Sequence, residues 1–130
     1  MNMFLGNFDV ANSVENSNIP IKTLTATNRK IVNNTTANVL ELREAGIYNV
    51  DGWVTASGPA GNVEINVIAD GKLRDTIVGS ISADNEFVTL PIVDAVRAVI
   101  DRFPNVAELS LQVGTGGLTI SGLIRVEYLQ

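Results

Sequence analysis

The side chains that could do chemistry here are carboxylates, hydroxyls and lysines, because the 130-residue sequence contains no histidine and no cysteine. Without histidine, the chain lacks the commonest general base and the commonest zinc ligand. Without cysteine, it has neither thiolate nucleophiles nor disulfides. Serine and threonine could be activated only by a lysine, and none of the three lysines stands in a recognisable catalytic pattern: Lys22, Lys30 and Lys72.

The carboxylates do not form a catalytic or metal-binding pattern. Asp94 and Asp101 are seven residues apart in a predicted helix, which places both on its solvated face. Three aspartates near predicted strand ends could ligate Ca²⁺ together with backbone carbonyls, but their spacing fits no calcium-binding loop: Asp70, Asp75 and Asp84. Gly114-Thr115-Gly116-Gly117 lacks the Lys-Ser/Thr pair and the following helix of a phosphate loop. We therefore predict no enzyme, no cofactor and no metal site.

Net charge and hydropathy limit the classes of partner that the chain is expected to have. The formal net charge is −5, and no cluster of lysine and arginine offers a surface for phosphates, so nucleic acid is not an expected partner. No apolar run approaches the roughly 18 residues that span a membrane, so no membrane partner is expected. The first residues lack the basic and apolar regions of a signal peptide, and we expect the chain to be made in a cytoplasm.

Two stretches near the C-terminus show the clearest strand pattern. Apolar residues alternate with polar ones over 107–113 and again over 118–130. The Gly-rich stretch between them predicts a hairpin. The second strand stays apolar to its end, which favours a place in the middle of a sheet or against a partner chain. Leu123 and Leu129 break its polar face.

Most of the remaining chain also predicts short strands separated by turns. In residues 46–56, Trp53 lies on the less apolar face. Asp70-Gly71 is the strongest hairpin signal of the chain. The other predicted strands are 19–27, 30–32, 39–42, 63–69, 72–82 and 86–90.

One segment has a different period. Apolar residues repeat at helical spacing after Pro91, and Pro104 would end the segment. These signals predict a short amphipathic helix over residues 92–102. Because strands and helices do not otherwise alternate, the fold class we expect is all-β, an antiparallel jelly-roll sandwich with this helix inserted.

The first 18 residues have no sustained periodicity and are rich in asparagine and serine. We interpret residues 1–18 as an extended N-terminal arm and 19–130 as the jelly-roll domain. A loosely packed tail is the simpler alternative. Three large apolar residues would serve as anchors when the arm orders on a partner: Phe4, Leu5 and Phe8.

About half of the chain, residues 38–72 and 106–129, resembles the C1q/TNF-like jelly-roll domains found in bacteriophage virion proteins. The matching residues are Val39-Leu40-Glu41-Leu42 running into Glu44-Ala45-Gly46-Ile47-Tyr48, Val63-Glu64-Ile65-Asn66-Val67 followed by Asp70-Gly71-Lys72, and Leu118-Thr119-Ile120-Ser121-Gly122-Leu123-Ile124-Arg125-Val126. The resemblance implies a homotrimer with the terminal strands near the threefold axis, and a binding or structural role. The predicted helix departs from it, since such domains have a strand-to-strand loop there.

The function we expect is that of a trimeric virion structural protein, a capsid decoration, cement or head-fibre protein. Its N-terminal arm would bind the major capsid protein lattice. The candidate trimer contacts are Trp53, Leu123, Tyr128 and Leu129. One alternative is a carbohydrate- or receptor-binding module of a phage tail fibre, and another is a C1q-like adhesion module.

Overall fold

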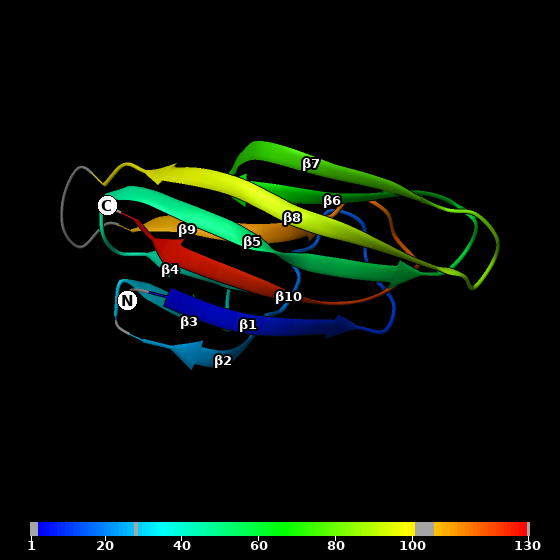
Figure 1. Cartoon of the computed structure of the whole chain (residues 1–130), viewed down its shortest axis with the longest axis horizontal. Coiled ribbons are helices and arrows are strands. Elements are labelled where there is room, and N and C mark those ends of the chain that lie inside the picture. Colours follow the sequence, from blue (N-terminus) through cyan, green and yellow to red (C-terminus); the bar gives the residue numbers. More distant parts are fainter. Residues whose placement is uncertain (1–2, 28, 101–105, 130) are drawn as a thin grey trace.

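Two antiparallel five-stranded sheets pack face to face in the computed structural model, which describes residues 3–27, 29–100 and 106–129 (Figure 1). Sheet A has the strand order β2-β1-β10-β5-β8, and sheet B has the order β3-β4-β9-β6-β7. The strands are β1 (Met3–Val10), β2 (Lys22–Ala26), β3 (Ile31–Asn34), β4 (Val39–Leu42), β5 (Gly46–Ser57), β6 (Gly61–Ala69), β7 (Lys72–Ile81), β8 (Phe87–Ala98), β9 (Ala107–Val113) and β10 (Thr119–Tyr128). The described residues form no helix, and so none that could span a membrane.

The core lies between the sheets and is mainly aliphatic. On β5, Tyr48, Val50 and Val54 are fully buried, while Trp53 on the other face is exposed. This is the period-two pattern that a strand with one face on the core requires. The largest fully buried side chains are Tyr48, Phe4, Ile19, Leu40, Leu42, Ile65, Ile81, Ile92, Leu109, Leu111, Leu118 and Ile120. The all-β sandwich that the sequence predicts is therefore confirmed.

The predicted hairpin of the last two strands is wrong, although both strands form. β9 lies in sheet B between β4 and β6, and β10 lies in sheet A between β1 and β5. The residues Gly114–Gly117 thus cross from one sheet to the other. Both apolar faces still meet the same core, from opposite sides, so alternation alone does not distinguish a hairpin from a crossover. The prediction that the C-terminal strand lies in the middle of a sheet is confirmed.

The hairpin predicted at Asp70-Gly71 does form. β6 and β7 pair up to Ala69 opposite Lys72, and the two residues between them have φ angles of 51° and 74°. Two central residues with positive φ are what a tight turn needs to match the twist of its strands. The Asp-Gly pair therefore determines the register of the edge of sheet B.

The predicted helix at 92–102 is wrong, because residues 87–98 form the edge strand β8. β8 pairs with β5 along its whole length, from Phe87 opposite Ser57 to Ala98 opposite Gly46. Ile92 and Val96 fit either period, and Asp94 at an inward position hides the alternation of the strand. Pro91 is compatible with an edge strand, whose outer N–H groups have no ladder partner. Residues 101 and 102 of the expected helix lie outside the described residues.

The N-terminal segment is also different from the prediction. Residues 3–10 form β1, hydrogen-bonded between β10 and β2. Phe4 and Phe8 point into the core and are 0% and 4% exposed. The Phe8 ring lies over Gly122, where an added Cβ would be 2.5 Å from Cζ of Phe8. In this fold β1 is a strand of the sandwich and its two phenylalanines are core residues, so they cannot be anchors on a partner.

Candidate functional site

Five apolar side chains lie at neighbouring register positions on the outward face of sheet A, and we call them the sheet A patch: Leu5, Trp53, Pro91, Val93 and Leu123. Trp53 is 48% exposed and Val93 is 76% exposed. Trp53 stands opposite Leu123 of β10 on one side and Pro91 of β8 on the other. The patch therefore crosses four neighbouring strands, from β1 to β8. Scattered exposed apolar residues are normal on proteins, but a contiguous group on one sheet face marks a contact surface.

An ion pair lies within the sheet A patch. Arg125 of β10 donates from Nε to Asp51 Oδ1 at 3.0 Å and from Nη2 to Asp51 Oδ2 at 2.7 Å. The hydrogen bond to Asp51 raises the pKa of the Arg125 guanidinium, so Arg125 keeps its charge. In the sheet register it stands between Leu5 on β1 and Val93 on β8. A partner could cover this surface without isolating a charge, since both charges are already paired within the subunit.

The predicted contact residues fall into two groups. Trp53 and Leu123 lie in the sheet A patch, and Leu129 is 44% exposed just beyond the end of β10. Tyr128 faces the other way. Its ring centroid is 5.0 Å from that of Tyr48, and its hydroxyl donates to the carbonyl of Ala45 at 3.0 Å. Tyr128 thus packs against the core and is not part of the patch.

Three members of the sheet A patch are not among the predicted trimer contacts. Val93 falls within the predicted helix and Pro91 directly before it, and Leu5 is a predicted anchor of the N-terminal arm. A period-two reading of residues 87–98 would have placed Pro91 and Val93 on one outward face. Leu5 is recognisable only after β1 is known to pair with β10, because its neighbour on the patch, Arg125, is distant in sequence.

The end of the sandwich next to Tyr128 is closed by the buried hydroxyl of Tyr48. This hydroxyl donates to the carbonyl of Glu44 at 2.6 Å and accepts the N–H of Glu44 at 3.2 Å. Burial raises the pKa of Tyr48 to about 12, above its usual value of 10.0. The neutral phenol is therefore part of the folded structure.

We expect the free energy of unfolding to fall between pH 10 and about pH 12 because of Tyr48. In that range the unfolded chain has lost the phenol proton and the folded chain keeps it, so a rise in pH favours unfolding by up to about 1.4 kcal/mol per pH unit. Urea unfolding at several alkaline pH values measures this slope. The variant Tyr48→Phe removes the group and should be less sensitive to pH; an equal slope in both proteins would contradict the assignment.

Two of the candidate carboxylates, Asp70 and Asp84, have local structural roles. Asp70 accepts the N–H of Glu108 at 2.8 Å, and Asp84 accepts the N–H of Ala60 at 2.9 Å. Asp94 lies on β8, and Asp101 lies outside the described residues. Within residues 3–27, 29–100 and 106–129, no three acidic, histidine or cysteine side chains gather closely enough to hold a metal ion.

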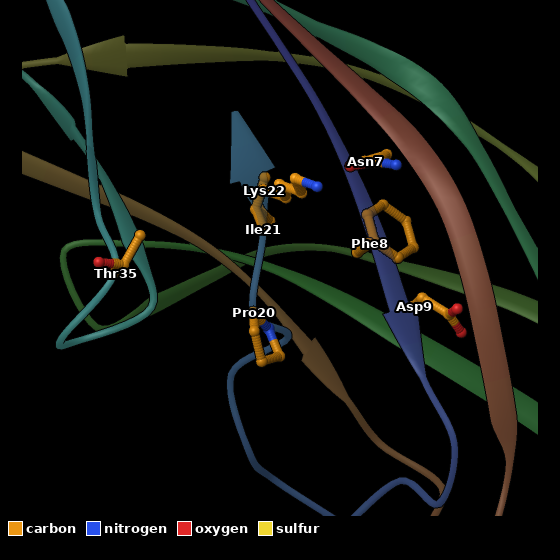
Figure 2. Close-up of a pocket in the computed structure, with 7 residues that line it drawn as sticks. All are labelled: Asn7, Phe8, Asp9, Pro20, Ile21, Lys22 and Thr35. Atoms are coloured by element: carbon orange, nitrogen blue, oxygen red, sulfur yellow. The ribbon is translucent and has the colours of Figure 1, made fainter. Parts of the chain in front are cut away.

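A groove of about 510 Å³ is the second surface feature of interest (Figure 2). It lies beside β1, at the start of β2 and near the turn between β3 and β4. Its lining combines apolar side chains with amide, hydroxyl and charged groups: Asn7, Phe8, Asp9, Pro20, Ile21, Lys22 and Thr35. Sequence reasoning did not identify this groove, because its residues come from three separate segments.

Comparison with known proteins relates the chain to one fold. No protein-family model and no curated protein sequence matches it. Among solved structures, the globular domain of zebrafish complement 1qA has a TM-score of 0.77 at 5% identity and covers 100% of this chain and 98% of its own. The TNF protein Eiger from S. frugiperda has a TM-score of 0.77 at 8% identity, covering 100% and 94%. The PRD1 vertex protein P5 has a TM-score of 0.56 at 11% identity, covering 98% and 73%.

These similarities confirm the predicted resemblance to C1q/TNF-like jelly rolls and include a bacteriophage structural protein. At 5–11% identity, the likeness is one of fold.

Proposed function

We propose that this C1q/TNF-like jelly roll is a trimeric structural module of a bacteriophage virion. The observation that carries the proposal is the sheet A patch. Burying one large apolar side chain stabilises an interface by roughly 1.5–3 kcal/mol, and the patch offers several on four strands. One face that packs squarely on its own copy gives a twofold dimer, so a trimer places this patch beside a threefold axis, where three copies cover one another's apolar side chains in a closed ring.

The Arg125–Asp51 pair favours a specific contact between subunits over non-specific hydrophobic association. Its two hydrogen bonds satisfy both side chains within one subunit. A second copy that covers Trp53 and Leu123 removes this pair from water, which strengthens its Coulomb attraction but also costs the hydration of both charges. The two parallel hydrogen bonds of the pair offset part of that cost.

The virion role is supported by the fold likeness to the PRD1 vertex protein P5. We propose the major capsid protein lattice as the partner. With Phe4 and Phe8 in the core, attachment has to use the outer surface of the trimer and not a flexible arm. Three equivalent sites on one trimer raise the avidity for a repeating lattice well above the affinity of a single site.

Co-sedimentation with assembled capsids of the phage that encodes the chain tests this role. We expect the wild-type protein to pellet with capsids, and Trp53→Glu to bind at least about 100-fold more weakly because a single subunit loses avidity. Val78→Glu is the matched control. Val78 is 60% exposed on sheet B, so the same charge is added away from the sheet A patch. A wild-type protein that stays in the supernatant would rule out the lattice as partner.

A further inference from the structure

The groove in Figure 2 forms where the ladder between β1 and β2 opens. Pairing of β1 with β2 ends at Asn7 opposite Lys22, whereas β1 stays paired with β10 as far as Val10. The chain before β2 turns towards sheet B, where the N–H of Ile19 donates to the carbonyl of Leu111 at 2.8 Å. Figure 2 shows the end of β1 facing the segment that enters β2, and the space between them is the groove of about 510 Å³.

The walls of the groove are fixed before any ligand arrives. Nδ2 of Asn33 donates to the carbonyl of Ile21 at 2.7 Å and to Oγ1 of Thr23 at 3.1 Å, which ties the entry of β2 to β3. Oδ1 of Asn34 accepts the N–H groups of Thr36 and Ala37, each at 3.1 Å, and so holds the turn that carries Thr35. A site with preset walls loses little conformational entropy when it binds.

Four polar side chains line the groove without a partner of their own: Asn7, Asp9, Lys22 and Thr35. Among the described residues, none of them makes a side-chain hydrogen bond or ion pair. Together they supply a carboxylate, an ammonium, an amide and a hydroxyl, hence both donors and acceptors. Phe8 and Ile21 are 4% and 6% exposed and so offer little apolar surface, while the exposed Pro20 supplies a rigid apolar ring.

This combination selects the class of ligand. Lys22 is the only cation of the lining and Asp9 the only anion, so their charges cancel. A phosphate or sulfate would need more cations, and a metal ion would need more carboxylates. A hydrocarbon would leave the four polar groups buried and unpaired, which costs about 1–3 kcal/mol for each. A neutral ring with several hydroxyls and an apolar C–H face matches every group.

We propose that this groove binds a neutral saccharide. Asp9 and Asn7 form hydrogen bonds with neighbouring sugar hydroxyls, and Pro20 packs against the sugar ring. Its volume lies within the usual range of roughly 300–1,000 Å³ for ligand sites and suits one or two sugar rings. The site lies within one subunit and does not include the exposed ring of Trp53. It goes beyond the virion role, and because Asn7 stands opposite Leu123 it borders the sheet A patch.

Saturation-transfer NMR on the full chain tests the saccharide site. The probes are glucose, galactose, mannose and N-acetylglucosamine, each at about 10 mM because single sugars bind weakly. We expect saturation transfer to at least one of them. Asp9→Asn keeps the shape of the side chain but removes its charge-assisted hydrogen bond, and should weaken binding at least about tenfold. Glu108→Gln, which removes one negative charge from an exposed position on β9, should bind like the wild type.

Three results would overturn the proposal. One is the absence of transfer to all four sugars. Another is unchanged binding in both Asp9→Asn and Thr35→Ala, two exposed positions where substitution should leave the fold intact. The third is binding that survives these variants but disappears in Trp53→Ala, which would place the sugar on the sheet A patch. Wild-type mass in solution, measured on the same samples, reports separately on the trimer.

Discussion

Removing residues 1–10 is expected to unfold the domain. β1 lies inside sheet A, so its loss would expose the edge of β10 and leave the spaces of Phe4 and Phe8 empty. Deleting a buried phenylalanine side chain costs about 3–5 kcal/mol, and a domain has only about 5–15 kcal/mol of stability in total. Circular dichroism of the truncated chain should therefore show no cooperative unfolding transition.

A single substitution tests whether stability depends on the packing of Phe8 itself, without shortening the chain. Phe8→Ala should lower the free energy of unfolding by about 3–5 kcal/mol in urea, because the Phe8 ring fills the space above Gly122. Asp9→Ala is the matched control next to it, and as an exposed position should change stability by no more than about 0.5 kcal/mol. A truncated chain with the same unfolding midpoint as the full chain would show that β1 is a detachable arm after all.

Trp53→Glu is expected to dissociate the trimer without unfolding its subunits. Trp53 is 48% exposed in one subunit, so the fold tolerates a polar side chain there. In the assembly, the change loses roughly 3 kcal/mol of apolar burial per subunit and adds an unpaired buried charge. The dissociation constant should rise by at least about 100-fold. Sedimentation at micromolar concentration measures it.

The control is again Val78→Glu, at an exposed apolar position of sheet B. It adds the same charge and should leave the mass of the assembly unchanged. If Trp53→Glu keeps the wild-type mass while Val78→Glu loses it, the subunits meet through sheet B and the sheet A patch is not the interface.

The period-two runs predicted most of the strands, because one face of each strand must reach the core. They did not reveal strand partners. β9 and β10 alternate as a hairpin would, yet each joins a different sheet. The valine-rich segment of β8 has apolar residues at helical spacing because Asp94 occupies an inward position, which hides the alternation of the strand. Here the pairing of β8 with β5 along twelve positions overrides the local pattern.

The N-terminal segment is a second case in which the local sequence pattern does not reveal the strand that forms. Apolar side chains on the outward face, Met3 and Leu5, hide the alternation of the strand in residues 3–10, where Phe4 and Phe8 mark the buried face. In the candidate sites, Trp53 and Leu123 could be found because each breaks an alternating pattern. The groove could not be found, since residues 7–9, 20–22 and 35 meet only in the folded chain.

The mass of the native protein in solution tests the central claim most directly. We expect a trimer of three 13.9 kDa chains, about 42 kDa, in sedimentation equilibrium at micromolar concentration. A single species of 13.9 kDa under the same conditions would contradict it, since the sheet A patch would then lie open to water.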